Sequence, residues 1–376
     1  MGNLAFRGLR LPRLGAMSGG FSPASLFAGN NGVWLDRSDL STLFQDEAGT
    51  TPVTAATQLD ALKLDKSQGL ALGPQVLANN DFSAGATSWL RQNEDGTHIL
   101  TFTGGTLRFQ SDTTSPILQL SQIEVLVVGK TYEVTTITSA WTSGSIKTDS
   151  FGQHVLSTGV GTTVLRLVAV RSDFRVVRDS PNVDITLDSI SIRLLSGNHA
   201  VQTTAGLTSR YQISPFRSQY DGADDFSATP FMTTLAGTIA VRMNSTTASR
   251  IALGSQPASD GRCYIGLASD GALAGGIGTQ ATAVIKGSTD IRGVWTTGIL
   301  TWDGTTVTLY QDGVSVYSAA QSGAVNTTIA MHEGGLNNNG TASSFTAGGI
   351  AQSIVLDRVM TPAEIANITT LWSNIS

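Results

Sequence analysis

Short alternating segments rich in β-branched residues are the feature that most constrains this chain. Each segment alternates apolar and polar side chains and ends in a cluster of Gly, Asn, Asp or Ser, which is typical of half-buried strands joined by tight turns. We expect Asp303-Gly304 and Asp312-Gly313 to turn two of the hairpins. The expected strands are 99–102, 106–109, 132–137, 164–170, 185–192, 238–243, 263–267, 295–302, 306–310 and 352–356. Their spacing predicts an all-β chain built from β-sandwiches.

One short helix is expected near the C-terminal end. The run Thr361-Pro362-Ala363-Glu364 places an N-cap threonine, a proline at the first helical position and a glutamate at the third. Ile365, Ile368 and Leu371 then fall on one face, so the helix is expected to pack through that face. A second helical turn is predicted within 38–44.

Composition excludes a disordered chain and a nucleic-acid-binding one. The chain has 376 residues, of which 40% are hydrophobic and 14% are charged, and this length suits two or three domains with packed cores. The formal net charge of −5 provides no basic field that would attract polyphosphate. We therefore expect no nucleic acid among its ligands.

Cysteine content and hydropathy set the expected location. Cys263 is the single cysteine, so the chain has no intramolecular disulfide and no cysteine-based zinc site. No apolar run approaches the roughly 18–20 residues that span a bilayer, and the N-terminus lacks the hydrophobic stretch of a secretory signal. The expectation is a chain with no membrane insertion and no classical export.

Residues 1–32 form an atypical segment before the first expected strand. Its arginines alternate with leucine and phenylalanine, and no acidic residue precedes Asp36. Two interpretations stay open: a disordered terminal tail, or an arm that orders on a partner by burying its apolar side chains and pairing its arginines. In the second interpretation the anchoring residues are Phe6, Arg7, Leu9, Arg10 and Arg13.

Three motifs after residue 196 resemble the laminin-G and concanavalin-A-like jelly-roll family. They are 220–226, 302–313 and 360–365, in that order. The resemblance implies a jelly roll in which the first motif opens a strand, the second forms a hairpin and the third forms the closing turn and helix. The acids of 221–225 suit a hard cation such as calcium, but residues 349–353 lack the acid that often completes such a site, and a solvated turn stays the alternative.

Residues 76–195 resemble a second kind of sandwich, a carbohydrate-binding-module-like jelly roll. The resemblance lies in the opening edge 76–83, followed by Trp89, and in the closing strand 185–192. Many members hold a structural calcium between these edges. Here Ser83 replaces the first acidic ligand, so the resemblance leaves Asp188, with Asp81, as the candidate calcium ligands; no other cofactor is expected.

The front of the chain resembles modular proteins of tailed-bacteriophage particles. The resemblance rests on 33–36 and 43–53, and such proteins carry an Asp-Lys-Ser element followed closely by a Gly-Asn-His-Ala element. Here the two elements, 64–67 and 196–200, lie far apart in sequence, so we predict that one domain is inserted into a loop of another. The predicted domains are an arm (1–32), a discontinuous β-sandwich (33–73 and 196–376) and an inserted jelly roll (74–195).

No catalytic residues are expected. The histidines lack metal-binding spacing, no Gly-x-Ser-x-Gly turn joins a strand to a helix, and the strand acids Glu124, Glu133 and Asp188 are isolated. A depolymerase or glycosidase would require a pair of carboxyl groups in one groove. This leaves binding or structural roles.

Sugar recognition needs an aromatic face surrounded by amide and carboxylate groups. A core role remains the alternative for each aromatic candidate, and Trp295, Trp302 and Tyr310 are interpreted as core residues. The candidate carbohydrate-binding residues are Trp141, Tyr132, Phe174, Asn337, Asn338 and Asn339.

The leading hypothesis is a non-enzymatic virion protein, such as a head-fibre, spike, decoration or tail-fibre subunit. It would dock through its arm on capsid, portal or tail proteins and display its sandwiches to host-surface polysaccharide. A homo-oligomer is expected because repeated copies raise avidity. The alternative is a bacterial surface or secreted lectin-like protein that binds polysaccharide.

Overall fold

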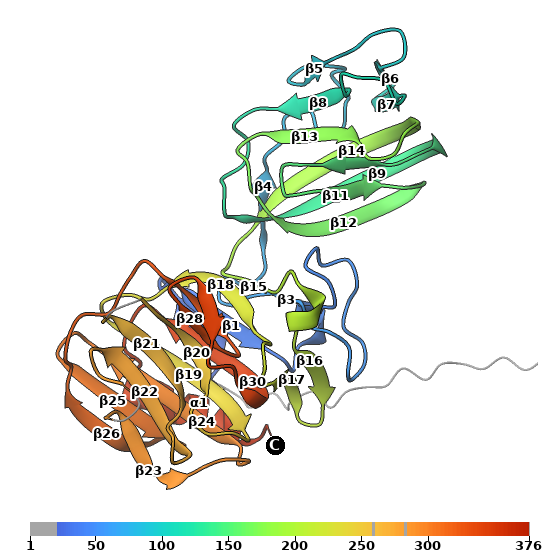
Figure 1. The fold of residues 1–376 in the computed structure, drawn as a ribbon. Helices are drawn as coiled ribbons and strands as arrows, with labels where there is room; N and C mark the ends of the chain where they lie inside the picture. Colours follow the sequence, from blue (N-terminus) through green and yellow to red (C-terminus); the bar gives the residue numbers. More distant parts are fainter. Residues whose placement is uncertain (1–20, 258–259, 282–283, 376) are drawn as a thin grey trace, which may run out of the picture.

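The computed structural model describes residues 21–257, 260–281 and 284–375. These residues form two β-sandwiches stacked end to end, with one short α-helix (Figure 1). The prediction of an all-β chain with a short C-terminal helix is confirmed. None of the helices in the described ranges is long and apolar enough to cross a membrane.

The sandwich in the middle of the sequence consists of a six-stranded and a five-stranded sheet. Its strands are β4 (Leu72–Gln75), β5 (Leu90–Gln92), β6 (Ile99–Thr103), β7 (Thr106–Ser111), β8 (Gln119–Gln122), β9 (Thr131–Ser143), β10 (Ile146–Thr148), β11 (His154–Ser157), β12 (Gly161–Val168), β13 (Phe174–Arg178) and β14 (Val183–Leu195). The sheet orders are β12-β9-β14-β7-β6, with β4 beside β14, and β11-β10-β13-β8-β5. Alternate apolar residues of both sheets meet in one core.

The other sandwich is built from the two flanking parts of the chain. Its strands are β1 (Gly32–Asp36), β2 (Leu43–Phe44), β3 (Leu62–Lys63), β15 (Ala200–Val201), β16 (Arg210–Ile213), β17 (Phe216–Asp221), β18 (Ser227–Met232), β19 (Gly237–Ser245), β20 (Ile251–Gln256), β21 (Arg262–Leu267), β22 (Ala272–Gly278), β23 (Lys286–Asp290), β24 (Thr296–Trp302), β25 (Thr306–Gln311), β26 (Val314–Ala320), β27 (Ala330–Glu333), β28 (Leu336–Asn338), β29 (Thr341–Ser343) and β30 (Ala347–Leu356). We call it the outer sandwich.

The outer sandwich has an eight-stranded and an eleven-stranded sheet. The first has the order β16-β17-β30-β19-β24-β25-β26, with β1 beside β30. The second has the order β2-β3-β15-β18-β27-β20-β21-β22-β23, with β28 beside β20 and β29 beside β28. The core between them contains Ile239, Leu300, Ile350, Cys263 and Leu273.

The helix α1 (Pro362–Ser373) covers part of the outer face of the eight-stranded sheet. The predicted capping box is present: the Thr361 hydroxyl accepts from the Glu364 N–H, and the Glu364 carboxylate accepts from the Thr361 N–H. Ile365, Ile368 and Trp372 pack on this face together with the 3-10 helix η1 (Pro23–Phe27). Two shorter 3-10 turns, η2 (Leu40–Thr42) and η3 (Ala205–Leu207), lie in loops.

The chain runs from the outer sandwich to the middle sandwich and back again, and hydrogen bonds of Asp65 hold the outgoing and returning segments together. Its carboxylate accepts hydrogen bonds from the Trp34 N–H at 2.7 Å and from the Asn198 N–H at 2.7 Å. The Asp65 N–H donates to Nδ1 of His199 at 2.9 Å. The Asp-Lys-Ser and Gly-Asn-His-Ala elements therefore lie side by side, although β4 to β14 separate them in sequence. A second contact runs from the Arg166 N–H of the middle sandwich to the Ala48 carbonyl at 2.7 Å.

Candidate functional site

A polar groove lies on the outer face of the eight-stranded sheet, beside the part that α1 covers. β17 forms its wall. Ser218 and Tyr220 point into the core, so the residues of β17 that alternate with them face outward. Two adjoining hollows of about 400 and 330 Å³ form the groove and share Gln219, Thr246 and Gly348. We call it the β17 groove. The first hollow is lined by Thr208, Arg210, Gln212, Gln219, Asp221 and Asp225, and the second by Ser214, Arg217, Gln219, Asn244, Thr246 and Trp295.

Two glycines at the start of β30 form the floor of the groove. A Cβ at Gly348 would overlap the Asn244 carbonyl, and its φ of 142° lies in the region that favours glycine. A Cβ at Gly349 would overlap Cδ of Arg217 and lie 3.0 Å from Cη2 of Trp295. Glycine at 349 therefore lets an arginine and an indole ring approach the same point of the sheet.

The second hollow holds Arg217, which has no carboxylate within 4.0 Å among residues 21–257, 260–281 and 284–375. Nε of Arg217 donates to Oε1 of Gln219 at 3.0 Å, and Nη1 donates to the carbonyls of Ser214 at 2.9 Å and Pro215 at 3.2 Å. Burial lowers the pKa of the Arg217 guanidinium. Trp295 is half-buried across Gly349 from it. The hollow thus combines an aromatic ring, an unpaired cation and neutral polar groups.

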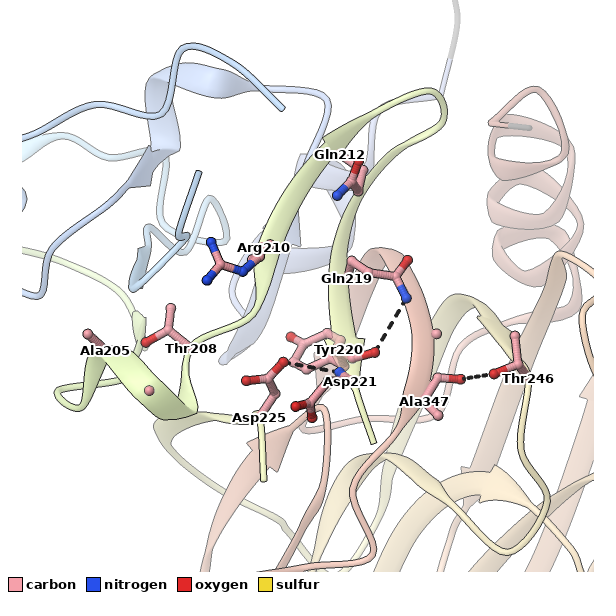
Figure 2. A pocket seen from close by; sticks show the side chains of 12 residues that line it. Ala205, Thr208, Arg210, Gln212, Gln219, Tyr220, Asp221, Asp225, Thr246 and Ala347 are labelled. Atoms are coloured by element: carbon pink, nitrogen blue, oxygen red, sulfur yellow. Dashed lines mark hydrogen bonds between the residues drawn. The ribbon is translucent and has the colours of Figure 1, made fainter. Parts of the chain in front are cut away.

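The first hollow is acidic at one end. Figure 2 shows Asp221 and Asp225 together, with Arg210 on one side and Thr246 on the other. Asp221, Asp224 and Asp225 each bring a carboxylate oxygen within 4.8 Å of the others. Burial, and then the charge of Asp221, raises the pKa of Asp225 to about 6. Converging carboxylates suit a hard cation, which would relieve their repulsion.

The predicted calcium ligands of the middle sandwich lie elsewhere. Asp81 is exposed, and its Oδ1 accepts from the Ser83 N–H and hydroxyl at 3.2 and 2.8 Å. Asp188 is half-buried in β14. The one group of three metal-ligating side chains within 21–257, 260–281 and 284–375 is Asp221, Asp224 and Asp225, so it includes neither.

Two of the predicted stacking aromatics belong to the core. Tyr132 and Phe174 are 3% and 0% exposed, and both pack edge-on or tilted against Phe151. The prediction that they present a ring to sugar is wrong, because the alternation of β9 and β13 turns them inward. Trp141 differs: it is 44% exposed on β9, and its Nε1 donates to the Gly144 carbonyl at 2.7 Å. Its ring face remains available.

The predicted asparagine loop forms the tight turn between β28 and β29, on the eleven-stranded sheet. Asn337 is 7% exposed; its amide donates to the Ala330 carbonyl and its oxygen accepts from the Gly340 N–H. This bonding makes Asn337 a turn residue, which corrects its assignment to sugar binding. Asn338 and Asn339 are exposed, but they lie on the sheet that does not carry the β17 groove.

The anchoring residues predicted in the arm, Phe6, Arg7, Leu9, Arg10 and Arg13, lie outside the described residues. The chain is described from Phe21, which packs with Leu26 and Phe27 against the α1 side of the outer sandwich. The predicted boundary of the arm at residue 32 is therefore wrong, because residues 21–32 are part of the outer sandwich.

Sequence reasoning missed the β17 groove. Trp302 is a core residue as predicted, but Trp295, interpreted as core, precedes β24 and lines the groove. The alternation of 216–221 and the glycine pair 348–349 are the signals that could have found it. Which part of the sheet α1 leaves open depends on tertiary packing, and no local pattern reports that.

Residues 221–366 match the family model described as the concanavalin A-like lectin/glucanases superfamily. No curated protein matches the sequence. The matched segment contains β18 to β30, so this finding agrees with the β-sandwich architecture of the outer sandwich.

Several solved structures of carbohydrate-active proteins are similar at low identity. The CBM40 module of Ruminococcus gnavus IT-sialidase, bound to α2,3-sialyllactose, is 19% identical over 36% of this chain and 83% of that one, with a TM-score of 0.30. The NanB sialidase of Streptococcus pneumoniae is 15% identical over 36% of this chain and 24% of that one, with a TM-score of 0.30. Domain 4 of AbnA, a GH43 extracellular arabinanase from Geobacillus stearothermophilus, in complex with arabinotriose, is 15% identical over 43% and 76%, with a TM-score of 0.29.

Proposed function

We propose that this chain is a lectin-like, non-enzymatic protein that binds saccharide in the β17 groove. The observation that carries the proposal is the meeting of the Trp295 ring with neutral amides and hydroxyls on an open, glycine-floored part of a sheet. Sugars place an apolar ring face on an aromatic side chain and direct their hydroxyls to such groups. The match of residues 221–366 to a lectin and glucanase superfamily supports this choice of ligand.

Binding without cleavage fits the arrangement of the carboxylates. Glycoside hydrolysis uses two carboxyl groups that flank the scissile bond, roughly 5–9.5 Å apart. The oxygens of Asp221, Asp224 and Asp225 instead gather within 4.8 Å of one another, and the two that line the first hollow, Asp221 and Asp225, stand together at one end of it. Incubation with polysaccharide is expected to release no reducing ends; their release would show that the non-enzymatic part of the proposal is wrong.

We also propose that the protein is displayed on a tailed-phage or phage-like particle, bound through its arm to capsid, portal or tail proteins as a homo-oligomer. The support is the resemblance of 33–36 and 43–53 and the contact of Asp65 with Asn198 and His199, which reunites two elements that are adjacent in such proteins. A bacterial surface or secreted lectin-like protein would use the same groove. Deletion of residues 1–20 tests the display: it is expected to abolish incorporation into particles, and unchanged incorporation would favour the alternative.

A glycan array and a whole-cell binding assay test the ligand. Wild-type protein is compared with Trp295→Ala, with Trp295→Phe, which keeps a ring, and with Trp141→Ala in the middle sandwich. We expect saturable binding that Trp295→Ala loses and that Trp295→Phe and Trp141→Ala retain. Loss in Trp141→Ala alone would move the site to the middle sandwich, and no binding by folded wild type would refute the proposal.

A further inference from the structure

The second hollow of the β17 groove holds the positive charge of Arg217, which no side chain in the described part of the chain neutralises. We infer that this hollow selects saccharides that carry a carboxylate, with Arg217 as the residue that binds the carboxylate. The inference rests on the proposed saccharide-binding function and adds the class of sugar. The shared chemistry is the carboxylate of a uronic acid, a sialic acid or a pyruvate substituent.

Arg217 is held in place while part of its guanidinium stays free. Nε and Nη1 are fixed by the Gln219 side chain and by the carbonyls of Ser214 and Pro215. Nη2 has no hydrogen bond to any residue in the described ranges. A guanidinium that is already oriented loses little entropy when it binds, and it suits the planar geometry of a carboxylate.

The missing counter-charge distinguishes Arg217 from the arginines in ion pairs. Arg108 and Arg358, for example, each contact a carboxylate within 2.7 Å, whereas Arg217 has none within 4.0 Å among the described residues. Burial alone lowers the pKa of its guanidinium, with no acidic group opposing the shift. A bound carboxylate would compensate this partly desolvated cation.

The charges along the groove set the orientation of a bound ligand. The lining of the second hollow contains no acidic residue, while Asp221 and Asp225 stand at the far end of the first hollow. Like charge disfavours a carboxylate at that acidic end. We therefore place the carboxylate on Arg217, a sugar ring on Trp295, and uncharged hydroxyls toward Asp221.

Calorimetry with matched oligosaccharides tests the inference. The probes are a uronate oligosaccharide, the same compound with its carboxyl groups reduced to alcohols, a sialylated oligosaccharide and a pyruvate-substituted one. We expect full-length protein to bind at least one acidic probe about tenfold or more tightly than the reduced probe, as a charge-assisted hydrogen bond allows. Arg217→Gln should lose this preference and keep the affinity for the reduced probe.

Arg193→Gln is the matched control. Arg193 is exposed on β14 of the middle sandwich, outside the β17 groove, so this variant should keep the preference. Equal binding of acidic and reduced probes by wild type would overturn the inference and leave the proposed function intact. Absence of binding to every probe by folded wild type would also overturn the inference, and the glycan array would then decide the proposed function. If Arg217→Gln has a lower melting temperature than wild type, Arg217→Lys replaces it as the test. Arg217→Lys keeps the charge and is expected to retain part of the preference for acidic probes. Complete loss of that preference in folded Arg217→Lys would contradict the inference that the charge at this position binds the carboxylate.

Discussion

Replacing Glu333 with glutamine should destabilise the outer sandwich more than any surface change. Glu333, at the end of β27, forms an ion pair with Nη2 of Arg37, and both side chains are 0% exposed. Its Oε2 also accepts from the Tyr220 hydroxyl at 3.0 Å, and its Oε1 accepts from Oγ of Ser353 at 2.5 Å. Burial tends to raise the pKa of Glu333, but the charges of Arg37 and Lys63 outweigh it and hold the pKa below its usual value.

The magnitude follows from the charge that remains. Glu333→Gln keeps the size of the side chain but removes the ion-pair partner of the buried Arg37 and leaves only the more distant Asp60 as a counter-charge, and breaking a buried pair in this way costs about 3–5 kcal/mol. A domain has about 5–15 kcal/mol of total stability, so roughly a third of it would be lost. Asp290→Asn, which removes an exposed partner of Arg292, is the control and should change stability little, because solvent screens an exposed ion pair.

Urea unfolding followed by hydrogen exchange and mass spectrometry measures this loss in each sandwich separately. The middle sandwich has its own core and serves as an internal reference that should not change. The double variant Arg37→Gln with Glu333→Gln removes both charges and is expected to recover part of the loss. A shift no larger than that of Asp290→Asn would refute the reasoning.

Three further predictions concern single positions. The pKa of Asp225 is raised to about 6 from an ordinary 3.8, so the folded state binds the proton of this carboxyl group more tightly than the unfolded state does. The protonated Asp225 therefore contributes fully to stability below about pH 4, and this contribution is lost as the pH rises through 6. In urea titrations, the free energy of unfolding of Asp225→Asn should therefore exceed that of wild type by about 1–2 kcal/mol at pH 7 and by little at pH 4. Calcium should raise the free energy of unfolding of wild type at pH 7 only if the cluster binds it. Gly349→Ala should abolish saccharide binding in calorimetry while the middle sandwich stays unchanged, because a Cβ there overlaps Arg217; retained binding would remove the groove from the site. Thr361→Ala should cost about 1 kcal/mol in outer-sandwich stability through loss of the N-cap, and a change near zero would show that the cap contributes nothing.

Local chemistry made part of this structure predictable. The Thr361 capping box and the Asp312-Gly313 turn are each determined by neighbouring residues, and both form as expected. Tyr132 and Phe174 were misassigned because alternation gives two faces of a strand without saying which is buried. The hydrogen bonds that hold Arg217 come from residues of its own hairpin. The open part of the sheet beside Arg217 depends on where α1 packs, and the packing of α1 depends on residues from many parts of the outer sandwich.

The position of the groove bears on where the protein is displayed. Pro23 lines a third hollow, of about 450 Å³, which shares Ser214 and Pro215 with the second hollow. The described chain therefore begins on the face that carries the β17 groove, while the middle sandwich is stacked at the end of the outer sandwich marked by β3 and β15 (Figure 1). An arm docked on a particle close to residue 21 would turn the groove toward the attachment side.

Whole particles and isolated protein should then differ in their response to Trp295→Ala. If the arm holds the outer sandwich with its groove toward the particle, cell binding by particles should be weak and should change little on Trp295→Ala. Isolated protein should lose its binding on Trp295→Ala, because its groove is open to solvent, and Trp141→Ala, at an exposed position of the middle sandwich, should change binding in neither setting. Equal loss on Trp295→Ala in both settings would mean that the groove stays accessible on the particle, or that the protein works as a free lectin-like binder; incorporation of the 1–20 deletion into particles separates these two cases.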